Sequence, residues 1–191
     1  MTILLTNDDG YDADGICYLK SEIKKIEQTV TFAPRQNCSG YSAAISLGKD
    51  IEIEELNKDT FVISGTPADC SYFGLHGSKK FDFTQLVSGI NLGSNLGTDI
   101  FYSGTVGAAI AGLKLRYPPI AFSVASYQPK DLDFIAKKCA EICLYVRNIN
   151  IANRYLVNVN FPDINENNYI GSKLTTLSLI HISEPTRRST I

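Results

Sequence analysis

Thr2-Ile3-Leu4-Leu5-Thr6-Asn7-Asp8-Asp9-Gly10 is the stretch that decides the fold. Its first half is a short apolar and β-branched run, which predicts a buried strand. The run ends abruptly in two adjacent carboxylates and a glycine. In open α/β sheets, ligands bind in the crevice beyond the carboxyl ends of the strands. We therefore expect Asp8 and Asp9 at the ligand-binding edge of a sheet.

Two neighbouring carboxylates repel each other, and a divalent cation between them offsets that repulsion. A plainer interpretation is a strand-to-helix turn in which one aspartate caps the following helix. These residues alone leave both interpretations open.

The composition is that of one globular domain. The chain has 191 residues, 44% apolar and 20% charged, which excludes a disordered protein. A net charge of -2 offers no broad basic surface for a nucleic-acid duplex. No apolar run approaches the roughly 20 residues that cross a bilayer, and no secretory leader precedes the first strand. We expect a cytoplasmic protein with no membrane partner.

The cysteines support that expectation. Cys17, Cys38, Cys70, Cys139 and Cys143 form no CxxC pair and no zinc-ligand spacing. We expect five free thiols in a reducing compartment.

Strand and helix signals alternate along the chain. Strands are expected at residues 2–6, 30–33, 61–63, 83–90, 119–124 and 155–161, and before the strand at 61–63 the apolar residues Ile51, Ile53 and Leu56 alternate with acids. Helices are expected over 16–26, from Thr66 onward, and over 103–115 and 132–146. A typical helix start is formed by Thr66 at the N-cap, Pro67 at the first helical position and Asp69 at the third. The alternation predicts an α/β fold with a mostly parallel sheet and helices on both faces.

Three further polar clusters follow strand ends or open helices on the side expected for Asp8 and Asp9. They are Asn37 to Gly40, Ser88 to Gly97 and Tyr102 to Gly107. A serine hydroxyl from Ser39 and an amide oxygen from Asn91, added to two carboxylates, make an all-oxygen site. Such a site suits Mg²⁺, Mn²⁺ or Ca²⁺ rather than zinc.

The third cluster has the chemistry of an anion site. Ser103, Gly104 and Thr105 at a helix start offer backbone N–H groups, hydroxyls and a favourable dipole. Glycines around Asn91 and Asn95 let the backbone approach a ligand. Each cluster is also compatible with an ordinary turn or helix cap.

Five blocks together resemble the SurE family of survival-protein E 5'/3'-nucleotidases. The blocks are Asn7 to Gly10, Ala33 to Gly40, Gly65 to Cys70, Ser88 to Gly97 and Tyr102 to Ala109. They follow the family's order and spacing from residue 2 to about residue 162. The resemblance implies a Rossmann-like three-layer αβα sandwich. It also implies metal-dependent hydrolysis of nucleoside 5'- or 3'-monophosphates to nucleoside and phosphate, and in some members of short polyphosphate.

The resemblance also implies roles for individual residues. By position, the metal ligands are Asp8, Asp9, Ser39 and Asn91, with Asp8 and Asp9 catalytic, and the phosphate pocket is lined by Asn95, Ser103, Gly104 and Thr105. One divalent ion is implied, Mg²⁺ or Mn²⁺, with Ca²⁺ as an alternative. Attack by water and an aspartyl-phosphate intermediate both remain open.

Three positions depart from the family pattern. Asp14 stands where a proline is usual, Arg35 where an aspartate commonly follows Ala-Pro, and Cys38 where a basic residue often precedes the serine. We expect these changes to affect substrate preference more than metal binding.

The last residues differ in character from the rest. Leu177 to Arg187 resembles the translation of a transposase adapter used in sequencing libraries, although a natural strand with a polar end is the alternative. We expect a SurE-like domain over residues 1–176 and a non-native tail over 177–191. In the family, the region beyond contributes an arm and a helix to a homodimer or homotetramer. Oligomerisation and activity of this chain are therefore open.

Two other functions share features with this sequence. A Ca²⁺-dependent nucleoside hydrolase also uses an aspartate cluster after its first strand, but its Asp-x-Asp-Pro-Gly opening is absent. Release of free base rather than phosphate would identify it. A non-catalytic nucleotide-binding module or an inactive fragment is the second alternative, although no Gly-x-Gly-x-x-Gly follows the first strand.

Overall fold

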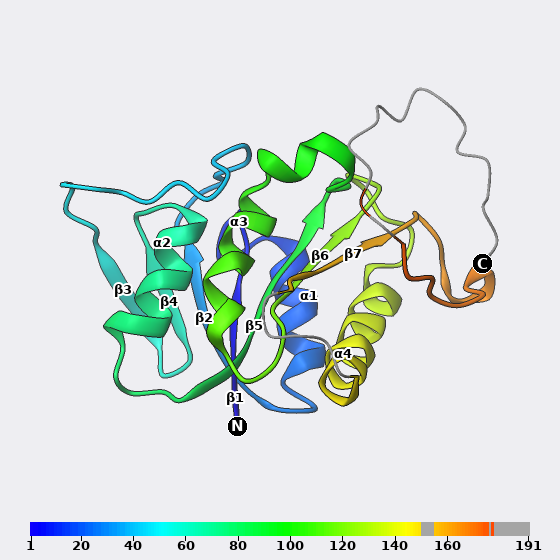
Figure 1. The fold of residues 1–191 in the computed structure, drawn as a ribbon, viewed down its shortest axis with the longest axis horizontal. Coiled ribbons are helices and arrows are strands. Elements are labelled where there is room, and N and C mark those ends of the chain that lie inside the picture. Colours follow the sequence, from blue (N-terminus) through cyan, green and yellow to red (C-terminus); the bar gives the residue numbers. More distant parts are fainter. Residues whose placement is uncertain (150–154, 176, 178–191) are drawn as a thin grey trace.

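A seven-stranded sheet forms the middle of the molecule in the computed structural model, which describes residues 1–149, 155–175 and 177 (Figure 1). The strand order is β3-β4-β2-β1-β5-β6-β7. The strands are β1 (Thr2–Thr6), β2 (Gln28–Pro34), β3 (Ile53–Asn57), β4 (Thr60–Ile63), β5 (Phe83–Leu92), β6 (Ile120–Val124) and β7 (Val157–Phe161). Neighbouring strands are parallel except β3 and β4, which form an antiparallel pair. Apart from Leu177, the expected tail over 177–191 lies outside the described residues.

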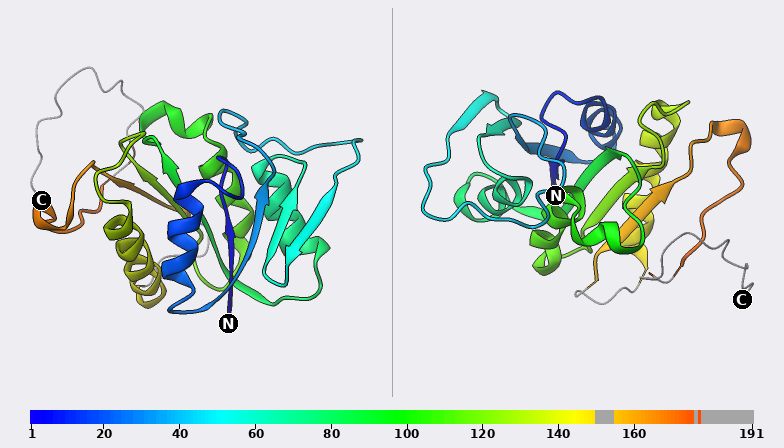
Figure 2. Two further views of the ribbon diagram at one scale, coloured as in Figure 1. Left: turned by 180° about the vertical axis from the view of Figure 1, so that it is seen from behind. Right: turned by 90° about the horizontal axis from the view of Figure 1, so that it is seen from above.

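Helices cover both faces of the sheet, as the alternation of signals predicted. On one face, α1 (Asp14–Ile23) and α4 (Leu132–Asn148) pack on Ile3 and Leu5 of β1. On the other, α2 (Pro67–Tyr72) and α3 (Gly104–Ile110) lie over Leu4. Successive side chains of a strand point to opposite faces, and the three central residues of β1, Ile3, Leu4 and Leu5, are all apolar, so β1 packs against both layers. Figure 2 shows the three layers from two further directions.

The chain reverses direction across the sheet at β1. It runs from β1 outward to β2 and β4, then returns to the opposite side of β1 as β5. The carboxyl ends of β1 and β5 therefore flank a topological switch point, the position where open α/β sheets bind ligands. Asp8 and Asp9 follow β1, and Asn91 lies near the end of β5.

The predicted helix start at Thr66 is confirmed. The Thr66 hydroxyl accepts a hydrogen bond from the Asp69 N–H at 3.1 Å, and the Asp69 carboxylate accepts one from the Thr66 N–H at 2.8 Å. This reciprocal capping box satisfies two N–H groups that a helix leaves free.

Helix α3 is shorter than its sequence pattern suggested. The expected helix over 103–115 ends at Ile110 and continues as a tight 3₁₀ turn, η3 (Ala111–Lys114). A Cβ on Gly112 would lie 2.7 Å from the Leu86 Cβ and 2.9 Å from the Pro119 Cβ. The change from α-helix to 3₁₀ turn thus coincides with close packing of Gly112 on the sheet. The periodicity of the sequence does not indicate this packing.

Four short helical segments were not anticipated individually. They are η1, a π-helical turn (Phe73–Gly77), and the 3₁₀ turns η2 (Gly97–Phe101), η3 and η4 (Glu166–Asn168). Within the described residues, none of the helices combines the length and apolar character that a membrane crossing requires.

Candidate metal and phosphate site

Asp8 is the buried centre of the site. Its side chain follows β1, and the residue is 4% exposed. The Thr105 hydroxyl donates to Asp8 Oδ1 at 2.5 Å. Burial raises the pKa of Asp8, and hydrogen bonds from Thr105 oppose that rise. A Cβ on Gly104 would lie 2.8 Å from Asp8 Oδ2, so the first turn of α3 reaches the carboxylate only because Gly104 has no side chain.

Asp9 is the more accessible carboxylate. Burial, and then the neighbouring charge of Asp8, raise its pKa to about 6, while hydrogen bonds from the Leu92 backbone and Asn37 lower it. In the part of the chain that the structure describes, no lysine or arginine forms an ion pair with Asp8 or Asp9. The pair therefore carries negative charge that protein cations leave uncompensated.

Asn37 connects Ser39 to this pair. Its amide donates to Asp9 Oδ1 at 3.2 Å, and its carbonyl accepts from the Ser39 N–H at 2.9 Å. The adjacent Cys38 N–H donates to the Asp8 carbonyl at 2.7 Å. The loop after β2 is thereby fixed against the loop after β1, with Ser39 exposed beside Asp9. Asn37 belongs to the predicted polar cluster, but the sequence alone does not identify it as a site residue.

Asn91 lies on β5 next to an irregularity. Three residues of β5 span the distance covered by two of β6 between the pairs Ser88–Ala121 and Asn91–Ser123. Such bulges redirect side chains and often lie beside active sites. The Asn91 Nδ2 donates to the Gly93 carbonyl at 2.7 Å, which leaves its amide oxygen available as a ligand.

Asn95 is held by the last strand. Its N–H donates to Asn160 Oδ1 at 2.8 Å, and its carbonyl accepts from Asn158 and Asn160 at 2.9 and 3.1 Å. Its side-chain amide donates to Ser123 Oγ at 2.8 Å. Asn158 and Asn160 were not predicted. Their alternation in Val157–Phe161 places them on one face of β7 and was the available signal.

Ser103 caps α3. Its hydroxyl oxygen accepts from the Val106 N–H at 3.1 Å, so its hydrogen remains free to be donated. Ser42 ties the loop after β2 to the same region, because its N–H and hydroxyl donate to the carbonyls of Tyr102 and Phe101 at 3.1 and 2.6 Å.

Taken together, Asp8 and Asp9 contact three segments that carry the other expected residues. Asn37 binds Asp9 and leads to Ser39, and the backbone of Leu92 binds Asp9 next to Asn91. Thr105, at the start of α3, binds Asp8. No described group of three or more His, Cys, Asp or Glu side chains is placed to hold a metal. The candidate donors are instead two carboxylates with a hydroxyl and an amide oxygen, which fits a hard divalent cation.

Comparisons with known proteins agree with this arrangement. The family model described as survival protein SurE matches residues 3–184. The chain belongs to the SurE family. It is 39% identical to the 5'-nucleotidase SurE of Acinetobacter baylyi over 169 residues, which cover 86% of this chain and 66% of that protein. It is 35% identical to the 5'-nucleotidase SurE of Halorhodospira halophila, covering 97% of this chain and 74% of the relative.

A solved structure shows the same fold. The crystal structure of the SurE protein from Aquifex aeolicus superposes with a TM-score of 0.86 at 36% identity, covering 93% of this chain and 73% of that chain. The expected three-layer fold and the family resemblance are both confirmed. This SurE chain spans about two thirds of the length of the first relative named above.

All three departures from the SurE pattern have clear structural positions. Arg35 donates to Glu54 of β3 at 2.9 Å, so its charge is directed to the sheet edge. Cys38 is buried, and its thiol lies 3.4 Å from the Gln36 carbonyl. Asp14 is the first residue of α1, where a negative charge is favourable.

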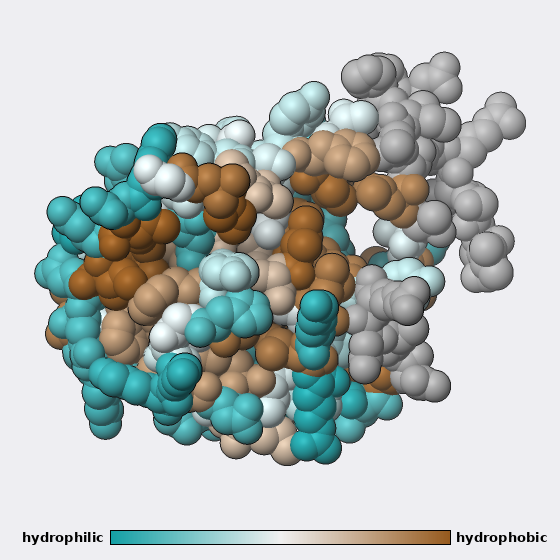
Figure 3. All heavy atoms as spheres, turned by 60° about the vertical axis from the view of Figure 1, so that its left-hand side comes forward, coloured by the Kyte–Doolittle hydropathy of each residue, from teal (hydrophilic) through white to brown (hydrophobic). Residues whose placement is uncertain are grey.

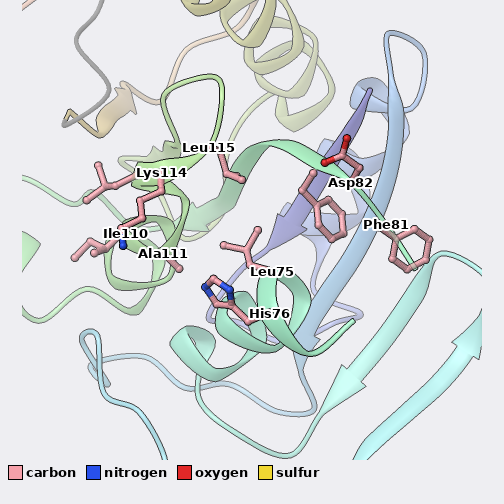
Figure 4. A pocket seen from close by; sticks show the side chains of 10 residues that line it. Leu75, His76, Phe81, Asp82, Ile110, Ala111, Lys114 and Leu115 are labelled. Carbon is pink, nitrogen blue, oxygen red and sulfur yellow. The ribbon is translucent and has the colours of Figure 1, made fainter. Parts of the chain in front are cut away.

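The cavity found in this SurE chain lies elsewhere. It has a volume of about 440 Å³ and is bordered by η1, by η3 and by Phe83, the first residue of β5 (Figure 4). Asn91 lies near the other end of the same strand. Because parallel sheets bind ligands at their carboxyl edge, this cavity is not part of the candidate site.

Proposed function

We propose that this chain hydrolyses nucleoside 5'- or 3'-monophosphates to nucleoside and phosphate, with one divalent cation held by Asp8, Asp9, Ser39 and Asn91. The observation that carries the proposal is the pair of adjacent carboxylates at the switch point. Their pKa values are raised by burial, and in the described chain no basic side chain pairs with them. The proteins named 5'-nucleotidase SurE, at 35–39% identity, support the reaction type.

The donor set fits Mg²⁺ or Mn²⁺, with Ca²⁺ as the alternative, because all four ligands are oxygens. A divalent cation bound there supplies Lewis acidity toward a phosphate oxygen and lowers the pKa of a coordinated water. Thr105 orients Asp8, and Asn37 orients Asp9, each by binding one carboxylate oxygen. A carboxylate has more lone pairs than these hydrogen bonds use, and the remaining ones are the expected positions for the cation.

The phosphate oxygens are assigned to the other half of the site. The Ser103 hydroxyl has a free hydrogen, and Gly104 begins α3 beside Asp8. Asn95 is presented on a loop held by β7. Thr105 keeps its predicted place in this pocket, but its hydroxyl is already bound to Asp8. Donors fixed in advance in this way stabilise developing phosphoryl charge without reorganisation.

Phosphate release from AMP, with and without EDTA, tests the proposal. We expect turnover that EDTA abolishes and excess Mn²⁺ restores. Release of adenine would indicate a nucleoside hydrolase instead. Tight AMP binding without turnover would indicate a binding module, and absence of both would indicate an inactive fragment.

A cytoplasmic location is part of the same proposal. All five cysteines are free, and four of them are buried, which fits a reducing cytoplasm. Assembly into a homodimer or homotetramer stays a prediction about full-length members of the family.

A further inference from the structure

Tyr127 is an exposed aromatic residue at the ligand edge that the proposed reaction does not use. It follows β6, the neighbour of β5, and it is 83% exposed. A Cβ built on Gly93 would lie 3.6 Å from Tyr127 Cε1 and 3.5 Å from Asn91 Nδ2. The phenol ring therefore lies across Gly93 from the candidate metal ligand Asn91.

The backbone that carries Tyr127 is held in place. The Ala125 N–H donates to the Phe161 carbonyl at 2.8 Å, and the Ser126 N–H to the Val124 carbonyl at 2.8 Å. The Gln128 N–H donates to the Ser126 hydroxyl at 3.2 Å. Gly93 is tied to the same strand end, because its N–H also donates to the Val124 carbonyl, at 2.9 Å. The segment that carries Tyr127 and the loop at Gly93 are therefore both held by the Val124 carbonyl.

The ring itself has room for a partner. Among the described residues, no aromatic ring stacks on Tyr127 and no cation lies over it. Gly93 has a φ of +139° and no side chain, so no Cβ stands between the ring and the Asn91 side chain. The nearby carboxylates disfavour a second anionic group, so a flat neutral group suits this position.

We propose that Tyr127 is the residue on which the base of a bound nucleotide stacks. This inference rests on the proposed function, since it assigns the base of the same substrate whose phosphate is bound at Asp8 and Asp9. Every base has an aromatic face, so stacking binds all bases, and the larger purines gain more contact.

Three other exposed aromatic residues compete for the role. Tyr41, 50% exposed, follows Ser39 by two residues, and Phe101, 59% exposed, directly precedes the third, Tyr102. Tyr102 is 69% exposed and directly precedes Ser103, on the α3 side of the site. Tyr127 is favoured because its ring and the Asn91 side chain are the nearest neighbours of a Cβ built on Gly93, whereas none of the other three residues is among them. Tyr145, 65% exposed on α4, provides a matched control away from this edge.

The test measures binding rather than turnover. Calorimetry with Mn²⁺ compares two phosphonates that cannot be hydrolysed, the analogue of AMP and the base-free analogue of ribose 5-phosphate. We expect Tyr127→Ala to weaken binding of the AMP analogue about tenfold relative to the base-free analogue, in line with measured base–aromatic stacking. Tyr127→Phe should retain the wild-type ratio of the two affinities, and Tyr145→Ala should not change it.

Three results would overturn the inference. They are equal affinity of the wild-type chain for both analogues, an unchanged ratio in Tyr127→Ala, and a base-specific loss in Tyr102→Ala instead. Failure of the proposed function gives a different pattern. AMP would then release no phosphate, while base-dependent binding that is lost in Tyr127→Ala would still support the stacking role.

Discussion

At the scale of single residues, Thr105 connects the start of α3 to the proposed metal site. Its hydroxyl donates to Asp8, the buried carboxylate. Thr105→Val keeps the shape but removes that donor, so the pKa of Asp8 should rise further. We expect Mn²⁺ affinity at pH 7 to fall about tenfold, the value of one hydrogen bond to a charged group. Calorimetric titration measures this.

Two variants make the Thr105 experiment decisive. Thr105→Ser should restore the affinity, and Thr84→Val, near the opposite end of β5, should not alter it. Unchanged Mn²⁺ affinity in Thr105→Val, with weaker inhibition by inorganic phosphate, would instead assign the hydroxyl to the phosphate.

Asp9 gives the metal-free protein a distinctive pH dependence. Burial and the charge of Asp8 raise its pKa from 3.8 to about 6. The folded state therefore binds the proton more tightly than the unfolded state, and this contribution to stability is lost as pH rises from about 4 to about 6. Asp9→Asn removes the effect. At pH 7 in EDTA, the free energy of unfolding of this variant should exceed that of the wild type by roughly 1 kcal/mol, which corresponds to a melting temperature about 2–4 °C higher.

The same variant should have no metal-dependent phosphatase activity. Melting curves in EDTA between pH 4 and 7, together with phosphate release in Mn²⁺, check both expectations. A lower melting temperature at pH 7 combined with retained activity would mean that the aspartate pair is purely structural.

At the scale of elements, the capping box of α2 also anchors the long loop after β2. Asp69 Oδ1 accepts from the Ser46 N–H at 2.9 Å, and the Thr66 hydroxyl donates to the Ala44 carbonyl at 2.6 Å. Burial would raise the pKa of Asp69, but the backbone N–H groups of Ser46 and Thr66 outweigh it and lower the pKa. Its contribution to stability is therefore present above pH 3.8 and is lost as pH falls through the lowered pKa.

Asp69→Ala should cost about 1–3 kcal/mol and lower the melting temperature by about 2–10 °C at pH 7. The difference from wild type should shrink below pH 3.8. Because the loop carries Ser39, Mn²⁺ affinity should fall as well. Glu52→Ala, an exposed acid before β3, is the control and should leave both quantities unchanged. A loss of stability without any change in Mn²⁺ affinity would show that the capping box of α2 does not influence metal binding.

Local signals predicted most elements well. Thr66, Pro67 and Asp69 defined the start of α2 because a cap is a contact between near neighbours in sequence. The end of α3 was not predictable in this way, since it coincides with the packing of Gly112 against Leu86 and Pro119. Strand β3 overlaps the stretch in which Ile51, Ile53 and Leu56 alternate with acids, and it lies at the edge of the sheet with all its residues exposed. Figure 3 shows the face on this side, where apolar groups are interrupted by hydrophilic ones.

The positions of the candidate site residues were predictable for a different reason, the topology of the sheet. Asp8, Asp9 and Ser39 follow strand ends and Asn91 lies near the end of β5, so all four are expected at one edge of the sheet, and their role as metal ligands stays a prediction. Asn37 and Asn160 were missed because their roles depend on which distant groups they meet, which a single sequence does not specify.

For the whole molecule, cation binding should raise stability. A ligand that binds only the folded state stabilises it by about 2.7 kcal/mol at a hundred times its Kd. For a chain of this size that corresponds to an increase in melting temperature of about 5–10 °C. Thermal melts with Mn²⁺, and again after EDTA, measure it. Ser39→Ala should reduce the shift, whereas Glu54→Gln on β3 should not. An equal shift in Asp8→Asn would show that the ion binds elsewhere.

The hydrogen bond between Asn95 and Asn160 can form only after β7 has been synthesised. The two residues are 65 positions apart, and β7 is the last strand of the sheet. Ribosomes add about 5–20 residues per second, so roughly 3–13 s separate the synthesis of the loop from that of its anchor. During this interval the nascent polypeptide already contains every expected metal ligand, while its phosphate-side loop lacks its support. A growing chain should thus acquire the ability to hold a cation before it acquires a fully ordered pocket for the nucleotide.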